Sequence, residues 1–220
     1  MVGHFHEFED EYLEMMYEFH EQFPLKRVRT GDLAAKLGVK PASATEMIQR
    51  LASRDLLDYV PYKGAKLTEA GFVHGQQMKR RHRLAELLLD ALPYEGNPHE
   101  TACRLEHAID DDLEVALSRM LGSHDTDPSG RPIPAASSKI QSRLDGVVAY
   151  ASLEDVPPSS PCTVRLLLLD DSACLWLKER GVEPGVRVLW DGEALVMADN
   201  RRLVVDPNWA RGVLMEHIGQ

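Results

Sequence analysis

Four side chains that can bind a metal ion lie close together in the segment from His99 to His107. They are His99, Cys103, Glu106 and His107, at positions i, i+4, i+7 and i+8, which share a sector of a helix roughly 100° wide. A mixture of imidazole, thiol and carboxylate suits a first-row divalent transition metal better than magnesium or calcium. A solvated polar helix face is the alternative, but a free cysteine is usually buried and fits it poorly. The segment therefore predicts a metal site.

The composition is that of an ordinary soluble protein. The chain has 220 residues, of which 44% are apolar and 27% charged, enough for one large domain or two to three small ones. The three cysteines, Cys103, Cys162 and Cys174, are widely spaced and odd in number, which favours a reducing compartment over a disulfide framework. No apolar segment has the length of a membrane span or of a signal core. We expect a cytoplasmic protein with no membrane partner.

Charge is distributed unevenly along the chain. The net charge is −10, yet residues 24–85 contain 13 Lys and Arg against 5 Asp and Glu. Residues 1–23 contain seven acids and no Lys or Arg. A basic segment inside an acidic protein is typical of a surface that binds phosphate, whereas the acidic segment can attract cations or form a solvated helix face.

The basic segment has the pattern of a winged helix-turn-helix. Apolar residues at helical spacing predict a helix over 7–22, and Thr30 is a plausible N-cap for a second helix over 32–37. Gly38 makes a turn, and Pro41 opens a third helix to about Leu57. Aromatic and β-branched residues then flank a predicted hairpin turn at Lys63-Gly64. An αα-hairpin beside a small hairpin is the alternative, but the local charge favours DNA binding.

Beyond this segment, helices are followed by strands. We expect a long helix from Thr68 to about Leu92, a helix opened by Pro98 and another over 110–121. A linker rich in Pro, Ser, Gly and Asp follows, from Gly122 to about residue 142. Short strand-like runs at 163–169, 186–190, 194–197, 202–205 and 213–217, with a helix near 170–180, indicate a small β-rich domain such as a barrel.

Several motifs appear in a fixed order. They are Glu11-Tyr-Leu, the helix-turn-helix, Arg81-His-Arg-Leu-Ala-Glu86, Ala102-Cys-Arg-Leu-Glu-His107 and Asp127-Pro-Ser-Gly-Arg-Pro-Ile-Pro134. The set resembles the diphtheria toxin repressor family of iron- or manganese-dependent transcription regulators, closely over residues 7–134 and more loosely beyond.

The resemblance implies a mostly α protein with a C-terminal β domain. Its parts would be a winged helix-turn-helix DNA-binding domain over 1–66, a helical metal-binding and dimerisation domain over 67–142, and an SH3-like β domain over 143–220. The protein would be a homodimer that binds double-stranded, palindromic operator DNA when loaded with metal. Apolar residues such as Leu84, Leu87 and Leu105 would supply the dimer interface.

The resemblance also implies two metal sites. The primary site would use Glu11, Cys103, Glu106 and His107, with Glu14 as a further ligand in manganese-type members. The ancillary site would use His82, Glu86 and His99, completed by Asp170 or Asp171 from the SH3-like domain.

The primary set is a hybrid of two subtypes, because iron-type members typically have methionine at the position of Glu11 and manganese-type members a carboxylate at that of Cys103. We expect Mn(II) or Fe(II), manganese first, with Co, Ni and Zn able to substitute in vitro.

The candidate DNA contacts come from the third helix and the wing. They are Lys40, Ala42, Ser43, Thr45, Glu46, Arg50, Lys63 and Lys66. Two other classes of function compete with a metal-dependent repressor. A zinc hydrolase would lack a His-Glu-x-x-His motif and a separate nucleophile. A winged-helix regulator of an organic ligand or oxidant would leave the clustered acids and histidines without a joint role. We therefore expect a regulator rather than an enzyme.

Overall fold

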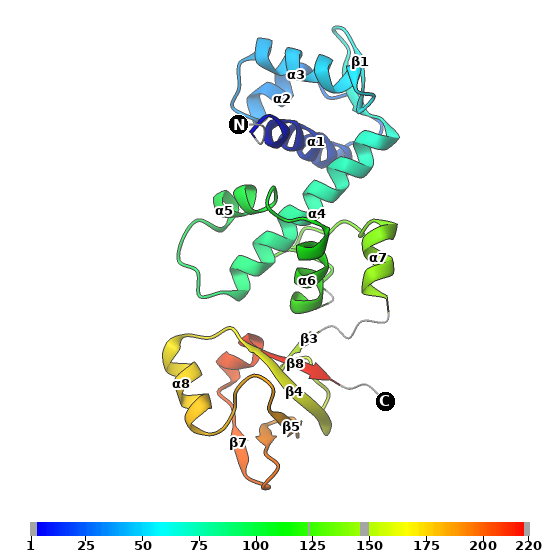
Figure 1. Cartoon of the computed structure of the whole chain (residues 1–220). Helices are drawn as coiled ribbons and strands as arrows, with labels where there is room; N and C mark the ends of the chain where they lie inside the picture. Colours follow the sequence, from blue (N-terminus) through cyan, green and yellow to red (C-terminus); the bar gives the residue numbers. More distant parts are fainter. Residues whose placement is uncertain (1–3, 123, 146–149, 218–220) are drawn as a thin grey trace. The chain divides into compact units, whose positions relative to one another are not determined.

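The computed structural model describes residues 4–122, 124–145 and 150–217 (Figure 1). The chain divides into two compact units. The first comprises Met1–His82, Cys103–Ala108 and Ile133–Ser137, and the second comprises Arg83–Ala102, Ile109–Pro132 and Ser138–Gln220.

The first unit contains the winged helix-turn-helix predicted from the sequence. Its elements are α1 (His4–Gln22), α2 (Thr30–Lys36), α3 (Pro41–Ser53), β1 (Leu57–Val60), β2 (Gly64–Leu67) and the first part of α4 (Glu69–Ala91). β1 and β2 pair antiparallel, with Leu57 opposite Leu67, and Val28 forms an isolated bridge to Ala65. The helix α3 ends at Ser53, earlier than the expected Leu57, and Asp55 beyond it has a positive φ.

One apolar core holds this unit together. α1 contributes Tyr12, Leu13 and Met16, and the other members come from α2, α3 and the hairpin: Leu33, Ala34, Ala44, Ile48, Leu51, Leu57 and Ala65. Because α1 lies in the same core as α2 and α3, any force that moves α1 acts on the helix-turn-helix.

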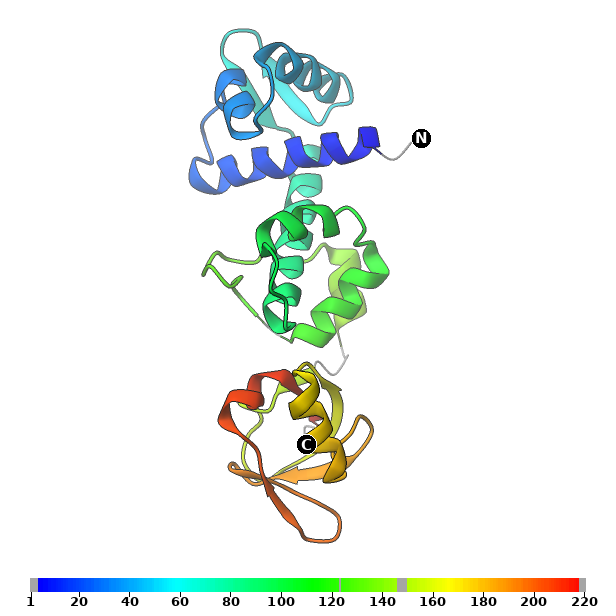
Figure 2. The ribbon, with the colours of Figure 1, turned by 90° about the vertical axis from the view of Figure 1, so that its left-hand side faces the viewer.

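The helix α1 also crosses the first part of α4, as Figure 2 shows. A Cβ atom placed on Gly75 of α4 would lie 2.5 Å from the carbonyl oxygen of Leu13, so the two backbones approach closely. The rings of Tyr17 and Phe72 lie beside this crossing, 5.2 Å apart between centroids. Glycine is therefore needed at position 75 for the helices to meet.

The second unit begins with helices. They are the rest of α4, α5 (Pro98–Leu105, whose last residues belong to the first unit), α6 (Asp111–Leu121) and α7 (Ser138–Leu144). Asp110 caps α6 by accepting a hydrogen bond from the Leu113 N–H at 2.8 Å. The helix α7 occupies the end of the segment that the sequence predicted to be a linker, a prediction that was wrong there. Among the described residues, no helix is long and apolar enough to cross a membrane.

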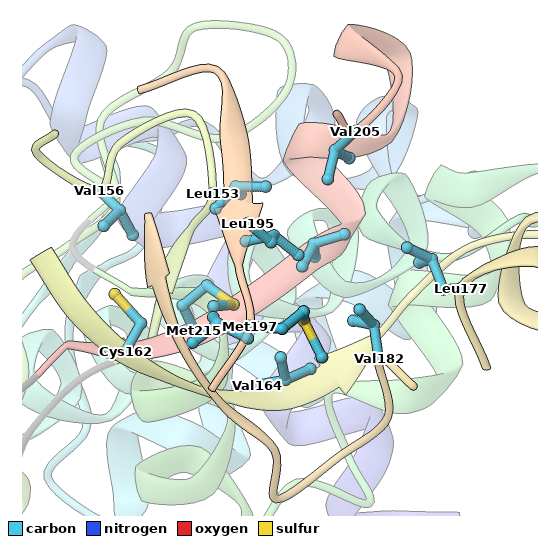
Figure 3. Close-up of a cluster of buried hydrophobic side chains, with 12 residues drawn as sticks. Leu153, Val156, Cys162, Val164, Leu177, Val182, Leu195, Met197, Val205 and Met215 are labelled. Atoms are coloured by element: carbon cyan, nitrogen blue, oxygen red, sulfur yellow. The ribbon is translucent and has the colours of Figure 1, made fainter. Parts of the chain in front are cut away.

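The second unit also contains an antiparallel sheet of six strands in the order β3-β8-β4-β5-β6-β7. The elements are β3 (Tyr150–Ser152), β4 (Ser160–Leu167), α8 (Asp171–Glu179), β5 (Arg187–Trp190), β6 (Ala194–Val196), β7 (Arg202–Val204), η1 (Pro207–Gly212) and β8 (Val213–His217). Its core gathers residues such as Val164, Leu195 and Met215 (Figure 3). The five predicted strands and the helix are present, whereas β3 and η1 were not predicted.

We predict that Gly75→Ala destabilises the protein by about 1–3 kcal/mol, because the added methyl group must push α1 away from α4. Urea unfolding followed by circular dichroism measures the change. Gly31→Ala in α2 is the matched control, since nothing lies within 4 Å of the added Cβ, and it should leave stability unchanged or slightly increased. Equal stability of the two variants would contradict the close crossing.

Candidate metal centre and nucleic-acid interface

Three buried ligand groups from separate segments meet in the first unit. Glu14 comes from α1, His82 from α4, and Glu106 from the turn that follows α5. Nδ1 of His82 lies 2.5 Å from Oε2 of Glu106 and 3.7 Å from Oε1 of Glu14. One donor atom from each of the three lies within 4.8 Å of the other two. Two ligands of one ion lie at most about 4.4 Å apart, so small side-chain adjustments complete a coordination shell.

One buried polar atom of this cluster supports its fit to a cation. Oε1 of Glu106 is buried, with no hydrogen-bond partner among the described residues. Nε2 of His107 lies 3.5 Å from Oε1 of Glu106. A buried polar atom without a partner is costly in a folded protein, and a bound ion is one of the ordinary reasons for it. The donor set of carboxylate and imidazole therefore fits a divalent transition metal.

Burial and mutual proximity raise the pKa of two of the acids near this cluster. Burial raises the pKa of Glu106 to about 7, and the negative charge of Glu14 acts in the same direction. Burial also raises the pKa of Glu11, where the charge of Glu14 raises it further and that of His107 lowers it. Glu11 therefore lies within electrostatic reach of both groups. A nearby cation would stabilise all three carboxylates in their charged form.

The sequence did not predict the role of Asp10. Its carboxylate lies between two histidines, with Oδ2 at 3.6 Å from Nδ1 of His107 and Oδ1 at 2.6 Å from Nε2 of His74. Although burial raises the pKa of Asp10, the two histidines outweigh it and lower the pKa to about 2. Asp10 in turn raises the pKa of His107. It directs the Nδ1 edge of His107 toward itself and so leaves Nε2 facing Glu106.

Lys79 was also missed. Its Nζ is buried and lies 2.9 Å from Oε1 of Glu14 and 2.6 Å from Oε2 of Glu18, both on α1. Burial lowers the pKa of Lys79, but the two carboxylates outweigh it and raise the pKa. The repulsion between the acids around His82 is therefore reduced, because Lys79 neutralises part of their negative charge. Lys79 precedes His82 by three residues on one predicted helix, and this spacing could have indicated that the two side chains are neighbours.

The helix that carries the first predicted ligands is shorter than expected. α5 ends at Leu105, so Glu106 and His107 lie in the turn beyond it and do not continue its face. Cys103 is a half-buried free thiol in the last turn of α5. The structure brings Glu14, His82 and Glu106 together with His107 beside them, and it places Glu11 one turn before Glu14 on α1.

The residues predicted for an ancillary site have different partners. His82 lies with Glu106, as described above, whereas Glu86 contacts His99 and Arg131 in the second unit. Asp170 caps α8 by accepting a hydrogen bond from the Ala173 N–H at 2.9 Å, and Asp171 is the exposed first residue of that helix. Ser172 lowers the pKa of Asp170 by hydrogen bonding. Of the residues predicted for the ancillary site, Glu86 and His99 therefore lie together in the second unit.

Most of the residues expected to contact DNA are exposed on α3 and the wing. Those exposed are Lys40, Ala42, Ser43, Glu46, Arg50 and Lys63, while Thr45 and Lys66 are half-buried. The hydroxyl of Thr45 donates to the carbonyl of Pro41 at 2.9 Å and is therefore engaged within its own helix. Tyr62 at the tip of the wing is also fully exposed and was not predicted.

The exposed side chain of Arg50 forms an ion pair with α1. Its Nε lies 2.9 Å from Oε1 of the buried Glu9, and Arg54 binds the other oxygen of the same carboxylate. The pair connects the end of α3 with α1. Removing Arg50 would therefore disturb a buried carboxylate as well as any phosphate contact.

The leucines expected at a dimer interface are already covered in part. Leu84 and Leu87 are buried within the single chain, whereas Leu113 on α6 and Leu92 after α4 are exposed. Leu105 is half-buried, so the three predicted leucines leave little exposed apolar surface in the single chain, and their place in an interface stays a prediction.

Two family descriptions match this chain. Residues 4–65 match the N-terminal DNA-binding domain of the iron-dependent repressors. Residues 68–135 match the iron-dependent repressor metal-binding and dimerisation domain.

Curated relatives and solved structures are similar along most of the chain. The diphtheria toxin repressor of Corynebacterium jeikeium is 30% identical over 73% of this chain and 72% of its own length. The iron-dependent repressor IdeR of Mycobacterium leprae is 31% identical over 80% of each chain. A manganese-dependent transcriptional repressor in complex with manganese has 25% identity and a TM-score of 0.53, covering 96% of this chain and 100% of its own.

We predict that the metal-free protein loses stability as the pH rises from about 5 to 8. A carboxyl whose folded pKa is raised contributes no penalty below its unfolded pKa, and its penalty grows until the pH passes the folded value near 7. Glu106→Gln cannot ionise, so its stability should fall less over this range, by about 2–3 kcal/mol. Urea unfolding with chelator present at both pH values measures the difference.

Glu100→Gln is the matched control, because Glu100 is an exposed acid on the neighbouring helix α5. Its pH dependence should follow that of the native chain. A Glu106→Gln variant with the same pH dependence as Glu100→Gln would show that Glu106 is not held in its buried, raised-pKa state.

Proposed function

The chain belongs to the iron-dependent repressor family, and we propose that it represses transcription by binding operator DNA as a dimer when loaded with Mn(II) or Fe(II). The observation that carries the proposal is the buried cluster of Glu14, His82 and Glu106, in which α1 meets α4 and the turn after α5. A buried group of acids and imidazoles beside a winged helix-turn-helix is suited to making DNA binding depend on a cation. The hydrolase alternative gains no support, because the relatives are repressors.

We infer that the metal ligands come from Glu11, Glu14, His82, Cys103, Glu106 and His107. A bound ion would supply positive charge among these acids. The surplus of carboxylate oxygen favours manganese, whereas the thiol or carbonyl of Cys103 favours iron, so we place manganese first. Cobalt, nickel and zinc are expected to substitute in vitro.

The chain's own contacts explain how such a site acts on DNA binding. Glu14 is on the α1 face that meets α4, while Leu13 and Met16 lie in the core with α2 and α3. Fixing α1 against α4 therefore fixes the position of α3. In a dimer the spacing of the two recognition helices must match two half-sites, so a small displacement reduces specific affinity.

The domain arrangement and setting complete the proposal. We propose a DNA-binding domain over 1–66, a metal-binding and dimerisation domain over 67–142 and an SH3-like domain over 143–220. The boundary between the two family matches, at residues 65–68, supports the first division. We further propose a cytoplasmic protein, a palindromic operator and a dimer interface built from exposed apolar residues such as Leu113.

We predict that Glu106→Ala abolishes the response of DNA binding to every metal, weakening activation about 100-fold or more, because it removes a buried anionic ligand. His107→Ala should behave similarly. Glu11→Met should instead shift the preference from Mn²⁺ toward Fe²⁺ and Co²⁺, because a thioether is a poor ligand for Mn²⁺. Fluorescence anisotropy measures binding to a duplex selected from random DNA in the presence of Mn²⁺, with each free metal buffered and oxygen excluded.

Glu100→Ala, an exposed acid on α5, is the control and should respond to metal as the native chain does. Metal-dependent binding that survives Glu106→Ala would exclude this site. An unchanged ratio of Mn²⁺ to Fe²⁺ activation in Glu11→Met would remove Glu11 from the ligands. Native binding that is unaffected by chelator would overturn the proposed function itself.

We predict that Lys40→Ala and Lys63→Ala each weaken binding to all sequences and lower the slope of log affinity against log salt by about one unit. Both lysines are exposed, at the start of α3 and on the wing, where they can neutralise phosphate. Lys178→Ala on α8 is the control and should leave the slope unchanged. A slope that stays constant in Lys63→Ala would place the wing outside the interface.

A further inference from the structure

The part of the Asp127–Pro134 motif that belongs to the second unit, Asp127 to Pro132, forms a closed loop. The side chain of Asp127 is fully buried and accepts hydrogen bonds from the backbone N–H groups of Ser129 and Arg131, both at 2.9 Å. Gly130 has a positive φ, and its N–H donates to the carbonyl of Asp127 at 2.9 Å. The loop therefore folds around one carboxylate.

This loop fixes the direction of the Arg131 side chain. Nε of Arg131 donates to Oδ2 of Asp127 at 2.6 Å, which leaves the end of the guanidinium pointing away from the loop. Its Nη2 donates to Oε2 of Glu86 on α4 at 2.6 Å. Arg83 of α4 also binds the loop, through the carbonyl of Pro132. The loop and α4 are thus joined by two arginines and two acids.

Both oxygens of Glu86 already have contacts. Oε2 accepts from Arg131, and Oε1 lies 3.2 Å from Nδ1 of His99, an exposed side chain. A divalent ion held by Glu86 would have to share this carboxylate with a guanidinium that the loop holds in place. These residues therefore do not fit the ancillary metal ion that the family resemblance implies.

We propose that Arg131 takes the place of a second metal ion at Glu86, so that Glu86 holds a guanidinium and not a metal ion in this protein. The guanidinium supplies a permanent positive charge where a metal would supply a regulated one. The fastening of the loop to α4 then holds whether or not metal is present.

Two further observations support the replacement of a metal ion by Arg131 at Glu86. Although burial lowers the pKa of Arg131, Glu86 and Asp127 outweigh it and raise the pKa, so the cation is stabilised where it lies. The four charges of Arg83, Glu86, Asp127 and Arg131 also balance, two positive against two negative. A divalent ion added to a balanced set leaves an excess of positive charge in a partly buried place.

The inference rests on the proposed function and is tested by counting bound metal ions. The full chain is stripped of metal and titrated with Mn²⁺, and the spectrum of free Mn²⁺ in electron paramagnetic resonance gives the number bound. We expect Arg131→Gln to bind one ion more per chain than the native protein does, with an affinity for that ion about ten-fold higher than in the native chain.

Two variants serve as matched comparisons. Arg143→Gln removes an arginine that also binds an acid, Asp112, and whose side chain is 38% exposed against 37% for Arg131, and it should leave the count unchanged. Glu86→Gln in the native background should also leave the count unchanged, because Glu86 holds Arg131 rather than metal. The double variant Arg131→Gln with Glu86→Gln should lose the additional ion again.

The outcomes separate this inference from the proposed function. Equal numbers of ions in the native chain and in Arg131→Gln would overturn the inference, as would loss of an ion in Glu86→Gln alone. A native chain that binds no Mn²⁺ would overturn the proposed function. A gain of one ion in Arg131→Gln would still support the role of Arg131 in that case.

Discussion

The burial of Glu106 beside His82 is the constraint on which the first unit depends. Its side chain is 1% exposed, and a carboxylate cannot stay charged in such a place without compensation. In the metal-free chain the compensation comes from the contact with His82 and from a raised pKa that favours the protonated form. The ammonium group of Lys79 stabilises the carboxylate of the neighbouring Glu14 through an ion pair. The chain thus keeps acids in a place where their charged forms are costly, and a bound cation would stabilise those charged forms.

The local elements could be predicted because their signals are local. Pro41 at the start of α3, the turn before it and the alternating residues of the hairpin are enough to place a winged helix-turn-helix. The end of α5 was misjudged because apolar and polar residues continue with helical spacing through Glu106 and His107, while the chain turns after Leu105. The helix α7 was missed because it follows a segment rich in proline and serine.

Much of the candidate site could not be predicted in the same way. The clustering of residue types in the sequence indicates Cys103, Glu106 and His107, and the family resemblance implies Glu11 and Glu14. Asp10 had no such signal, since its partners His74 and His107 are more than sixty residues away along the chain. The use of Arg131 by Glu86 was hidden for the same reason, because only the closed loop at Asp127 brings them together.

The neighbouring residues Glu9 and Asp10 show how α1 connects the buried acid cluster with α3. Glu9 points toward α3, where it binds Arg50 and Arg54 at the end of the recognition helix. Asp10 contacts His107 beside the acid cluster. Successive residues on a helix differ by 100°, so one turn of α1 reaches both partners at once. A displacement of α1 relative to His107 would therefore also move the partner of Arg50, so the two contacts are coupled through a single turn of helix.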